Sequence, residues 1–259
     1  MILSGRFGGG NRGGARPGGE PGGAPRWTSA GATDQGRVRS INQDAFLDRP
    51  ALGLWVVADG MGGHTDGAHA SRAIVDALAA LPHAPLLGRR ARAIIGTLRR
   101  VNDELLEHAA AMQADLIGST VAALVAVREH AAVLWTGDSR VYRLRAGQLT
   151  CLTTDHSQVQ MLIDEGLLAP ELAESHPAAN VLLRAVGSEA DLKVDYGLLR
   201  LQPGDRYLLC SDGLYRELTP EAMATVLGSA EPARSAPELV RQACAHGGRD
   251  NVTAVVVGL

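Results

Sequence analysis

The chain has 259 residues, of which 46% are hydrophobic and 3% aromatic, and its formal net charge is −3. This length and composition suffice for a large hydrophobic core and exclude a fibre or a wholly disordered protein. The acidic balance and the scarcity of aromatic rings argue against nucleic acid as a partner, because such partners are held by basic surfaces and stacking rings.

The length of the apolar stretches and the spacing of the cysteines indicate where the protein is located. No stretch reaches the roughly 18 to 20 apolar residues that a membrane helix needs, so we expect no membrane span. The cysteines, Cys151, Cys210 and Cys244, are odd in number and widely spaced. This pattern is typical of a reducing compartment and not of a disulfide framework. We therefore expect a cytoplasmic protein.

Residues 1–26 differ in composition from the rest of the chain. They are dominated by Gly, Pro and Arg without a collagen period. Such a segment cannot bury enough surface to offset its chain entropy, so we predict a flexible tail. A single folded domain is expected over residues 27–259.

The folded part begins with short strand-like pieces over residues 27–49. Apolar side chains at spacings of three and four then predict helices over residues 66–81 and 89–114. Four strand-like runs between residues 118 and 154, separated by turn residues, predict consecutive antiparallel hairpins in one meander. Residues 155–187 are expected to begin with a short helix and continue as an irregular excursion, typical of a lid or recognition flap.

The C-terminal part returns to strands. Strands are predicted over residues 192–201 and 206–210, helices over residues 220–227 and 235–245, and a last strand over residues 251–258. Strands in two blocks, with helices inserted as pairs, favour an α+β layered sandwich over a doubly wound sheet.

Carboxylates follow or precede several of these strands. The run VVADGMGGH brings Asp59 to the end of an apolar stretch and into a glycine-rich turn. An Asp-Gly pair at such a point is most often only a turn. The arrangement recurs, however, because Asp138, Asp212 and Asp250 also lie at the ends of strand-like runs. Four such carboxylates indicate a site.

Arg39 and Asp44 add two further candidates. Arg39 has the planar fork that binds phosphate in two parallel hydrogen bonds, and Asp44 is a candidate metal ligand. The alternative for each of them is an ordinary surface ion pair.

The set of donors indicates the type of metal. Carboxylates are hard oxygen ligands, and no Cys or His pairs have zinc spacing, so the site suits Mg²⁺ or Mn²⁺. Clustered carboxylates repel one another unless cations lie between them, which favours two ions over one. Two such ions can activate a shared water for attack on phosphorus.

Eight motifs occur together and in a familiar order: GRVRSINQDAF, VVADGMGGH, GST, TGDSRVYRL, LTTDHSQVQ, HPAANVLLRAVG, LLCSDGL and GRDNVTAVVV. On these motifs the chain resembles the metal-dependent serine/threonine protein phosphatases of the 2C type, in their compact bacterial branch. The resemblance covers about residues 27–259. It implies a catalytic domain built as a central β-sandwich of two antiparallel sheets flanked by helix pairs.

The resemblance also implies a role for each matching residue. Asp59 would bridge two core ions, Mn²⁺ or Mg²⁺. The Gly60 carbonyl would bind one of them, and Asp212 and Asp250 would complete the other. Asp44 would act through a metal-bound water.

Further positions follow from the same resemblance. Arg39 would hold the substrate phosphate, and Asp138, together with Asp212, would bind a third, weaker ion. Met61 stands where eukaryotic members carry a histidine that acts as general acid. His64, three residues later, would either donate the proton to the leaving oxygen or only hydrogen-bond within the loop. The role of Asn251, beside the last ligand, is left open.

The resemblance implies hydrolysis of phosphoserine and phosphothreonine on proteins by a metal-bridging hydroxide, opposing a bacterial kinase of the eukaryotic type. We expect a monomer. A first alternative is a pseudoenzyme that binds phosphoproteins without turnover, which retention of the ligand set disfavours. A second is a nucleotide-binding protein that uses GMGGH as a phosphate cradle, which is disfavoured because no Lys-Ser/Thr follows.

Overall fold

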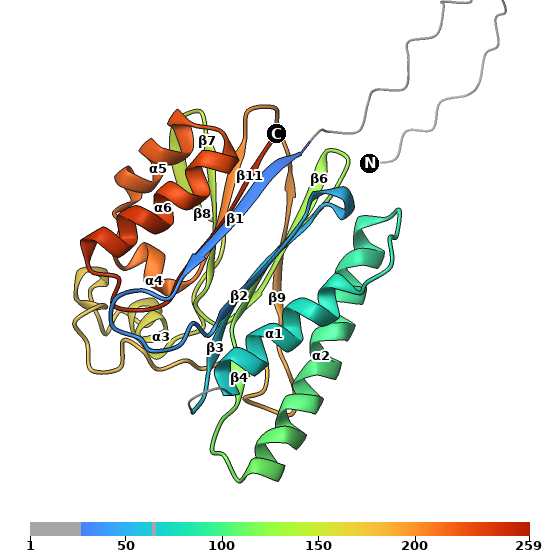
Figure 1. Ribbon diagram of the computed structural model, residues 1–259, viewed down its shortest axis with the longest axis vertical. Helices are drawn as coiled ribbons and strands as arrows, with labels where there is room; N and C mark the ends of the chain where they lie inside the picture. The colour runs from blue at the N-terminus through green and yellow to red at the C-terminus, as the bar shows by residue number, and fades with distance from the viewer. Residues whose placement is uncertain (1–26, 64–65) are drawn as a thin grey trace, which may run out of the picture.

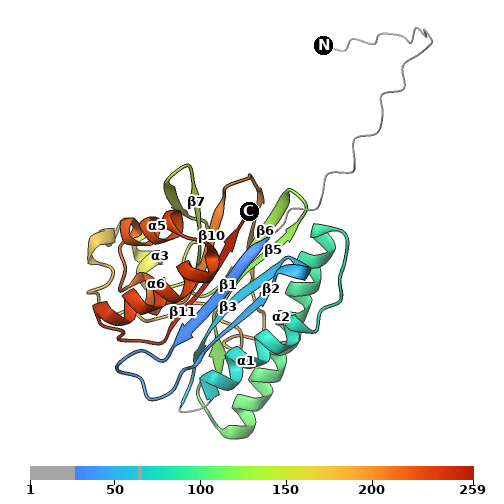
Figure 2. The ribbon, with the colours of Figure 1, turned by 45° about the horizontal axis from the view of Figure 1, so that its top comes forward.

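A computed structural model describes residues 27–63 and 66–259. Over these residues the strands form two antiparallel sheets that face each other, and helices cover the outer face of each sheet (Figures 1 and 2). The predicted flexible tail, residues 1–26, lies outside the described residues. The predicted α+β sandwich with flanking helix pairs is confirmed.

The first sheet has the strand order β1-β11-β10-β7-β8. Its strands are β1 (Thr28–Asp34), β7 (Arg140–Arg145), β8 (Gln148–Cys151), β10 (Arg206–Cys210) and β11 (Val252–Gly258). The second sheet has the order β2-β3-β5-β6-β9, and β4 pairs with the end of β3. Its strands are β2 (Asp44–Arg49), β3 (Leu54–Met61), β4 (Gly118–Ser119), β5 (Val121–Val127), β6 (His130–Thr136) and β9 (Asp195–Arg200).

The long helices pack as two pairs, one on each sheet (Figure 2). On the second sheet lie α1 (Asp66–Ala79) and α2 (Leu87–Met112), and on the first lie α5 (Pro220–Ser229) and α6 (Pro232–His246). Each pair turns its apolar stripe inward, as the spacing of three and four predicts. Four short elements complete the chain: η1 (Pro50–Leu52), α3 (Gln158–Asp164), η2 (Pro170–Leu172) and α4 (Asp212–Tyr215).

The core has three apolar layers, and β3 shows why. Val56 and Ala58 point to the helices α1 and α2, whereas Trp55 and Val57 point to the space between the sheets. Successive side chains of a strand alternate between its two faces, so a strand covered on both faces is apolar throughout. The unbroken apolar run before Asp59 is therefore a strand buried on both sides.

The four strands between residues 118 and 154 divide between the two sheets. β5 pairs with β6 in the second sheet, and β7 pairs with β8 in the first. The prediction of one continuous meander was therefore wrong. The chain crosses between the sheets at Gly137, whose φ of +102° suits glycine and where a Cβ would lie 2.6 Å from the Thr120 side chain.

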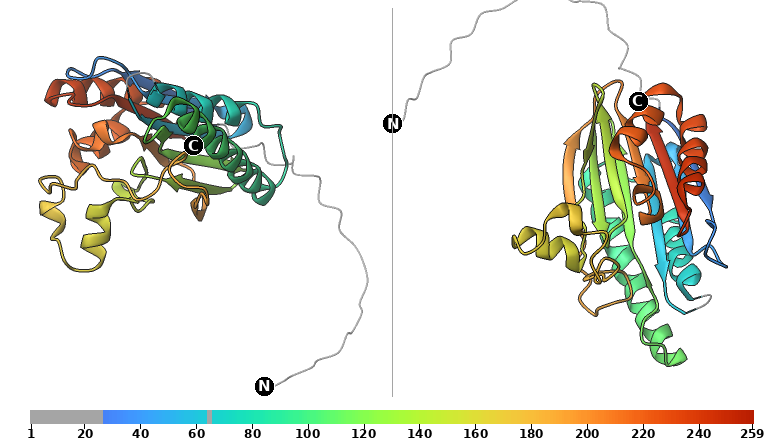
Figure 3. Two further views of the ribbon diagram at one scale, coloured as in Figure 1. Left: turned by 90° about the horizontal axis from the view of Figure 1, so that it is seen from below. Right: turned by 90° about the vertical axis from the view of Figure 1, so that its left-hand side faces the viewer.

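One end of the sandwich gathers the irregular segments. The excursion over residues 155–187 projects there, in yellow and gold in Figure 3, close to the loops that follow β6 and β10. Ser157 caps α3 by accepting a hydrogen bond from the Gln160 amide at 3.3 Å. Among the helices of the described residues, none has the length and apolarity required to cross a membrane.

Candidate metal centre

Strand register places carboxylates from both sheets at this end. Asp44 begins β2 directly opposite Asp59 on β3. In the other sheet, Asp212 lies just after β10. Asp250 lies two residues before β11, the strand that neighbours β10. The Ser211 hydroxyl joins the two sheets by donating to Asp44 Oδ2 at 2.7 Å. Residues that are up to 206 positions apart thus meet at one acidic centre.

Burial and mutual repulsion make the charged state of these carboxylates costly. Burial, together with the charges of Asp212 and Asp250, raises the pKa of Asp44 to about 7. Burial likewise raises the pKa of Asp138 to about 8 and that of Asp59 well above its usual value, with neighbouring carboxylates adding to both. A cation bound among them would remove this cost.

The donors fit a hard divalent cation. Within the described part of the chain, Asp44 Oδ1 and Asp212 Oδ1 are buried and have no hydrogen-bond partner. Buried polar atoms are nearly always satisfied, so two unpartnered carboxylate oxygens at one centre indicate that a ligand belongs there. Oxygen donors of this kind suit Mg²⁺ or Mn²⁺.

The arrangement of the side chains nevertheless differs from a closed coordination shell. No three His, Cys, Asp or Glu side chains of residues 27–63 and 66–259 are grouped as metal ligands. Both oxygens of Asp250 instead accept from Arg39, at 2.9 and 2.7 Å. The guanidinium of Arg39 thus neutralises part of the acidic charge, and Asp250 would have to share its oxygens between Arg39 and a metal ion.

The backbone beside Asp59 is closely packed. The Asp59 amide donates to the Thr120 hydroxyl at 3.1 Å, and this hydroxyl also bonds Ser139 Oγ at 2.7 Å. A Cβ at Gly60 would lie 2.0 Å from the Gly67 carbonyl oxygen. Glycine is therefore required at position 60, and the GST motif around Thr120 fixes the end of β3.

Asn251 holds the loop that carries Arg39. Its Oδ1 accepts from the Gln43 amide at 2.8 Å, and its Nδ2 donates to the carbonyls of Gln35 at 2.8 Å and Ile41 at 3.0 Å. These bonds tie both ends of the loop to the start of β11. The role of Asn251, which the sequence left open, is therefore to position this loop.

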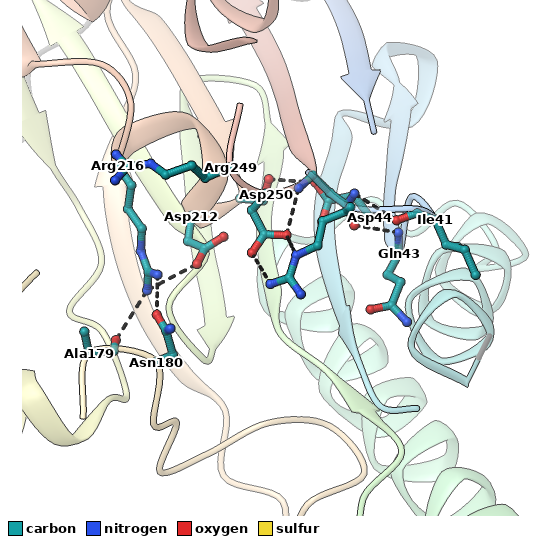
Figure 4. Close-up of polar contacts among 12 residues, drawn as sticks. Ile41, Gln43, Asp44, Ala179, Asn180, Asp212, Arg216, Arg249 and Asp250 are labelled. Atoms are coloured by element: carbon teal, nitrogen blue, oxygen red, sulfur yellow. Dashed lines mark hydrogen bonds and ion pairs between the residues drawn. The ribbon is translucent and has the colours of Figure 1, made fainter. Parts of the chain in front are cut away.

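Arg216 reaches the acidic centre from the C-terminal end of α4. Its Nη2 lies 3.2 Å from Asp212 Oδ2 and 3.6 Å from Asp138 Oδ2. The same side chain donates to the Ala179 carbonyl and to Asn180 Oδ1 (Figure 4). Arg216 is not among the residues predicted from the sequence, because no helix was predicted after Asp212. A predicted helical turn would have placed Arg216 beside Asp212 by the spacing of four.

Most of the predicted site residues line one open cleft of about 780 Å³. The lining includes Arg39, Asp59, Gly60, Asp138, Asp212 and Asp250. Asp44 lies behind this lining, opposite Asp59. For Arg39 the alternative of an ordinary ion pair is realised, with Asp250 and not Asp44 as its partner. His64 lies outside the described residues.

The fold is an α+β sandwich of two antiparallel sheets with an acidic centre at one end, whose oxygen donors suit a divalent cation. The sequence profile of the family Protein phosphatase 2C matches residues 33–242. The chain belongs to the protein phosphatase 2C family.

Named relatives agree with this assignment. Serine/threonine protein phosphatase PstP of Mycobacterium tuberculosis is 37% identical over 233 residues, which are 88% of this chain and 44% of PstP. The chain therefore spans less than half the length of that relative. Serine/threonine phosphatase stp of Listeria monocytogenes is 35% identical over 237 residues, which are 87% of this chain and 93% of stp.

Solved structures share the fold. PppA of Pseudomonas aeruginosa, described as a key regulatory component of T6SS, has a TM-score of 0.85 and 40% identity, with 91% of this chain and 98% of PppA covered. The catalytic domain of PstP, solved in complex with two manganese ions, has a TM-score of 0.79 and 34% identity, with 90% and 97% of the two chains covered.

Proposed function

We propose that this chain is a metal-dependent protein serine/threonine phosphatase, which hydrolyses phosphoserine and phosphothreonine esters. One observation carries the proposal: carboxylates from both sheets converge at one cleft, with two buried oxygens unpartnered, next to an arginine on a fastened loop. The relatives named serine/threonine phosphatases support the same activity and substrate class.

The residues that would hold two Mn²⁺ or Mg²⁺ ions are those at the end of the sandwich. Asp59 would bridge them, and the Gly60 carbonyl, Asp212 and Asp250, which line the same cleft, would complete their ligands. Asp44, behind Asp59, would act through water. When bound, such ions supply an activated water and neutralise the charge that develops on the phosphoryl group.

Arg39 is the group of this chain that would bind and orient the phosphate. Its guanidinium is 58% exposed at the cleft and already binds a planar carboxylate through two parallel hydrogen bonds. A phosphate presents the same pair of acceptors. His64 remains a proposed proton donor to the leaving serine or threonine oxygen.

The wider setting is proposed on the same basis. Residues 27–259 would form the catalytic unit, acting as a monomer in the cytoplasm. Its substrates would be phosphoproteins that a bacterial serine/threonine kinase has modified. A third ion at Asp138 and Asp212, which the family resemblance implies, is a separate question.

The test is hydrolysis of p-nitrophenyl phosphate and a phosphothreonine peptide with Mn²⁺, with Mg²⁺ and with EDTA. Activity should need the metal, and Asp212→Ala should lower kcat/KM by about 10²-fold or more, because metal stabilisation of the transition state is worth several kcal/mol. Glu238→Ala, an exposed carboxylate on α6, is the matched control and should retain activity.

One outcome would overturn the proposal. If the folded wild-type protein gave no turnover with either metal, the carboxylates would serve binding and not catalysis. The pseudoenzyme alternative would then stand, and binding of a phosphothreonine peptide without hydrolysis would identify it.

A further inference from the structure

We propose that the guanidinium of Arg216 takes the place of a third cation between Asp138 and Asp212 and fastens residues 179–180 to the metal centre. The proposal rests on the proposed function, because it concerns the ions of that same site. It gives the chain two metal ions and one built-in cation.

The charges of the described residues support this placement. Asp138 and Asp212 are 6% and 9% exposed, and buried carboxylates need a cationic partner. Arg216 Nη2 lies within 3.2 to 3.6 Å of one oxygen of each. A metal ion bound by these same oxygens would have to occupy the position of the guanidinium, and the two cations would repel each other.

The other charged groups nearby have partners of their own, so Arg216 can pair with Asp138 and Asp212. The third acid of this region, Asp155, accepts two hydrogen bonds from Arg140 at 2.9 and 2.8 Å. Arg140 in turn lies over the ring of Tyr215, 3.7 Å from its centroid. Asp155 is therefore already neutralised, and Arg216 is free to serve Asp138 and Asp212.

The same side chain bonds the irregular excursion over residues 155–187. Arg216 donates to Asn180 Oδ1, and its Nη2 donates to the Ala179 carbonyl at 3.3 Å. Figure 4 shows Arg216 between these two residues and Asp212. A divalent ion in its place could bind the Ala179 and Asn180 oxygens only as ligands, whereas a guanidinium pairs with both carboxylates and donates hydrogen bonds to both oxygens at once. The Arg216 side chain thus neutralises two carboxylates and at the same time holds the excursion in position.

The first measurement counts bound ions in the full chain. Titration of the metal-free protein with Mn²⁺, followed by calorimetry and by electron paramagnetic resonance of free Mn²⁺, should give two ions for the wild type. Arg216→Ala should bind a third ion more weakly, whereas Arg216→Lys, which keeps the charge, should remain at two. Arg249→Ala is the matched control, because Arg249 lies nearby but pairs with Glu217.

The second measurement uses amide hydrogen exchange to test whether Arg216 holds residues 179–180 in place. With saturating Mn²⁺, Arg216→Ala should increase exchange over residues 178–181 by about tenfold or more, since loss of one charged hydrogen bond is worth about 1.5 kcal/mol or more. Asn180→Ala should increase exchange there without adding an ion. Arg249→Ala should leave exchange in this segment unchanged.

The outcomes separate this proposal from the proposed function. Three ions in the wild type, with activity that needs metal, would overturn the role of Arg216 and leave the phosphatase assignment standing. A folded Arg216→Ala protein that stays at two ions, or that exchanges at the wild-type rate over residues 178–181, would also overturn it. Binding of no ion by the wild type would overturn both proposals.

Discussion

At the scale of single residues, Asp250 has two potential partners. It is a proposed metal ligand, yet both of its oxygens accept hydrogen bonds from Arg39. Because the bond is between groups of opposite charge, it keeps Arg39 at the cleft before any phosphate arrives. The arginine that would bind substrate and the carboxylate that would bind metal are therefore coupled directly.

Replacement of Arg39 by lysine tests its proposed role. Arg39→Lys keeps the charge but loses the planar fork, so kcat/KM for a phosphothreonine peptide should fall roughly 10- to 100-fold, the equivalent of about 1.5 to 3 kcal/mol for a charged hydrogen bond. Steady-state kinetics with Mn²⁺ measures this loss, and Arg249→Lys is the control. An unchanged kcat/KM would show that Arg39 does not bind the phosphate.

At the scale of elements, the end of the sandwich opposite the acidic centre is held by a second charged network. Asp205, in the turn between β9 and β10, is 1% exposed and accepts from Arg145 on β7 through both oxygens at 2.7 Å. The Tyr207 hydroxyl also donates to it, at 2.9 Å. These bonds hold the pKa of Asp205 below its usual value and fasten the turn to the first sheet.

Removal of this carboxylate should cost stability and leave the site intact. Asp205→Ala leaves Arg145 and Tyr207 without their partner, and we expect a loss of about 2 to 3 kcal/mol in the free energy of unfolding, moderated by the partial exposure of Arg145. Urea unfolding followed by tryptophan fluorescence measures it, with Glu238→Ala as a surface control. Equal stability of wild type and Asp205→Ala would contradict the expectation, and Mn²⁺ stoichiometry should stay the same.

At the scale of the whole molecule, the acidic centre couples folding to cations and to pH. The sandwich buries carboxylates that both sheets supply, and their protonated forms are favoured in the folded state without metal. The folded protein therefore binds protons that an unfolded chain releases near pH 4.

Stability of the metal-free protein should fall as pH rises. The contribution of Asp44 is fully present below its usual pKa of 3.8 and is lost as pH rises through about 7, and that of Asp138 is lost through about 8. Urea unfolding in EDTA at pH 6.5 and pH 8.5 should show the decrease, and saturating Mn²⁺ should reduce it by removing the contribution of the carboxylates at the two ions. His156, whose pKa burial lowers, opposes this trend only below about pH 6.5. Asp44→Asn should show a shallower decrease, and metal-free stability that rises over this interval would contradict the assignment.

Helices and strand ends can be predicted from the sequence because they depend on residues that are close together along the chain. The spacing of apolar residues predicted the helices α1 and α2, which the structure places at Asp66–Ala79 and Leu87–Met112. Carboxylates at the ends of apolar runs indicated the site. A strand buried on both faces is an unbroken apolar run, so the first polar residue after it marks the end of the strand. The layered fold followed from the order of these elements.

Pairings between distant segments became visible only in the tertiary structure. Periodicity does not say which sheet a strand joins, so the division of β5 to β8 between two sheets was not predicted. The bond from Arg39 to Asp250 spans 211 positions, and Arg216 meets Asp138 across two sheets. The sequence by itself therefore determined most of the helices and strands and the candidate donor residues of the site. The folded chain decided which charges face one another, because proximity in space depends on packing and not on spacing along the chain.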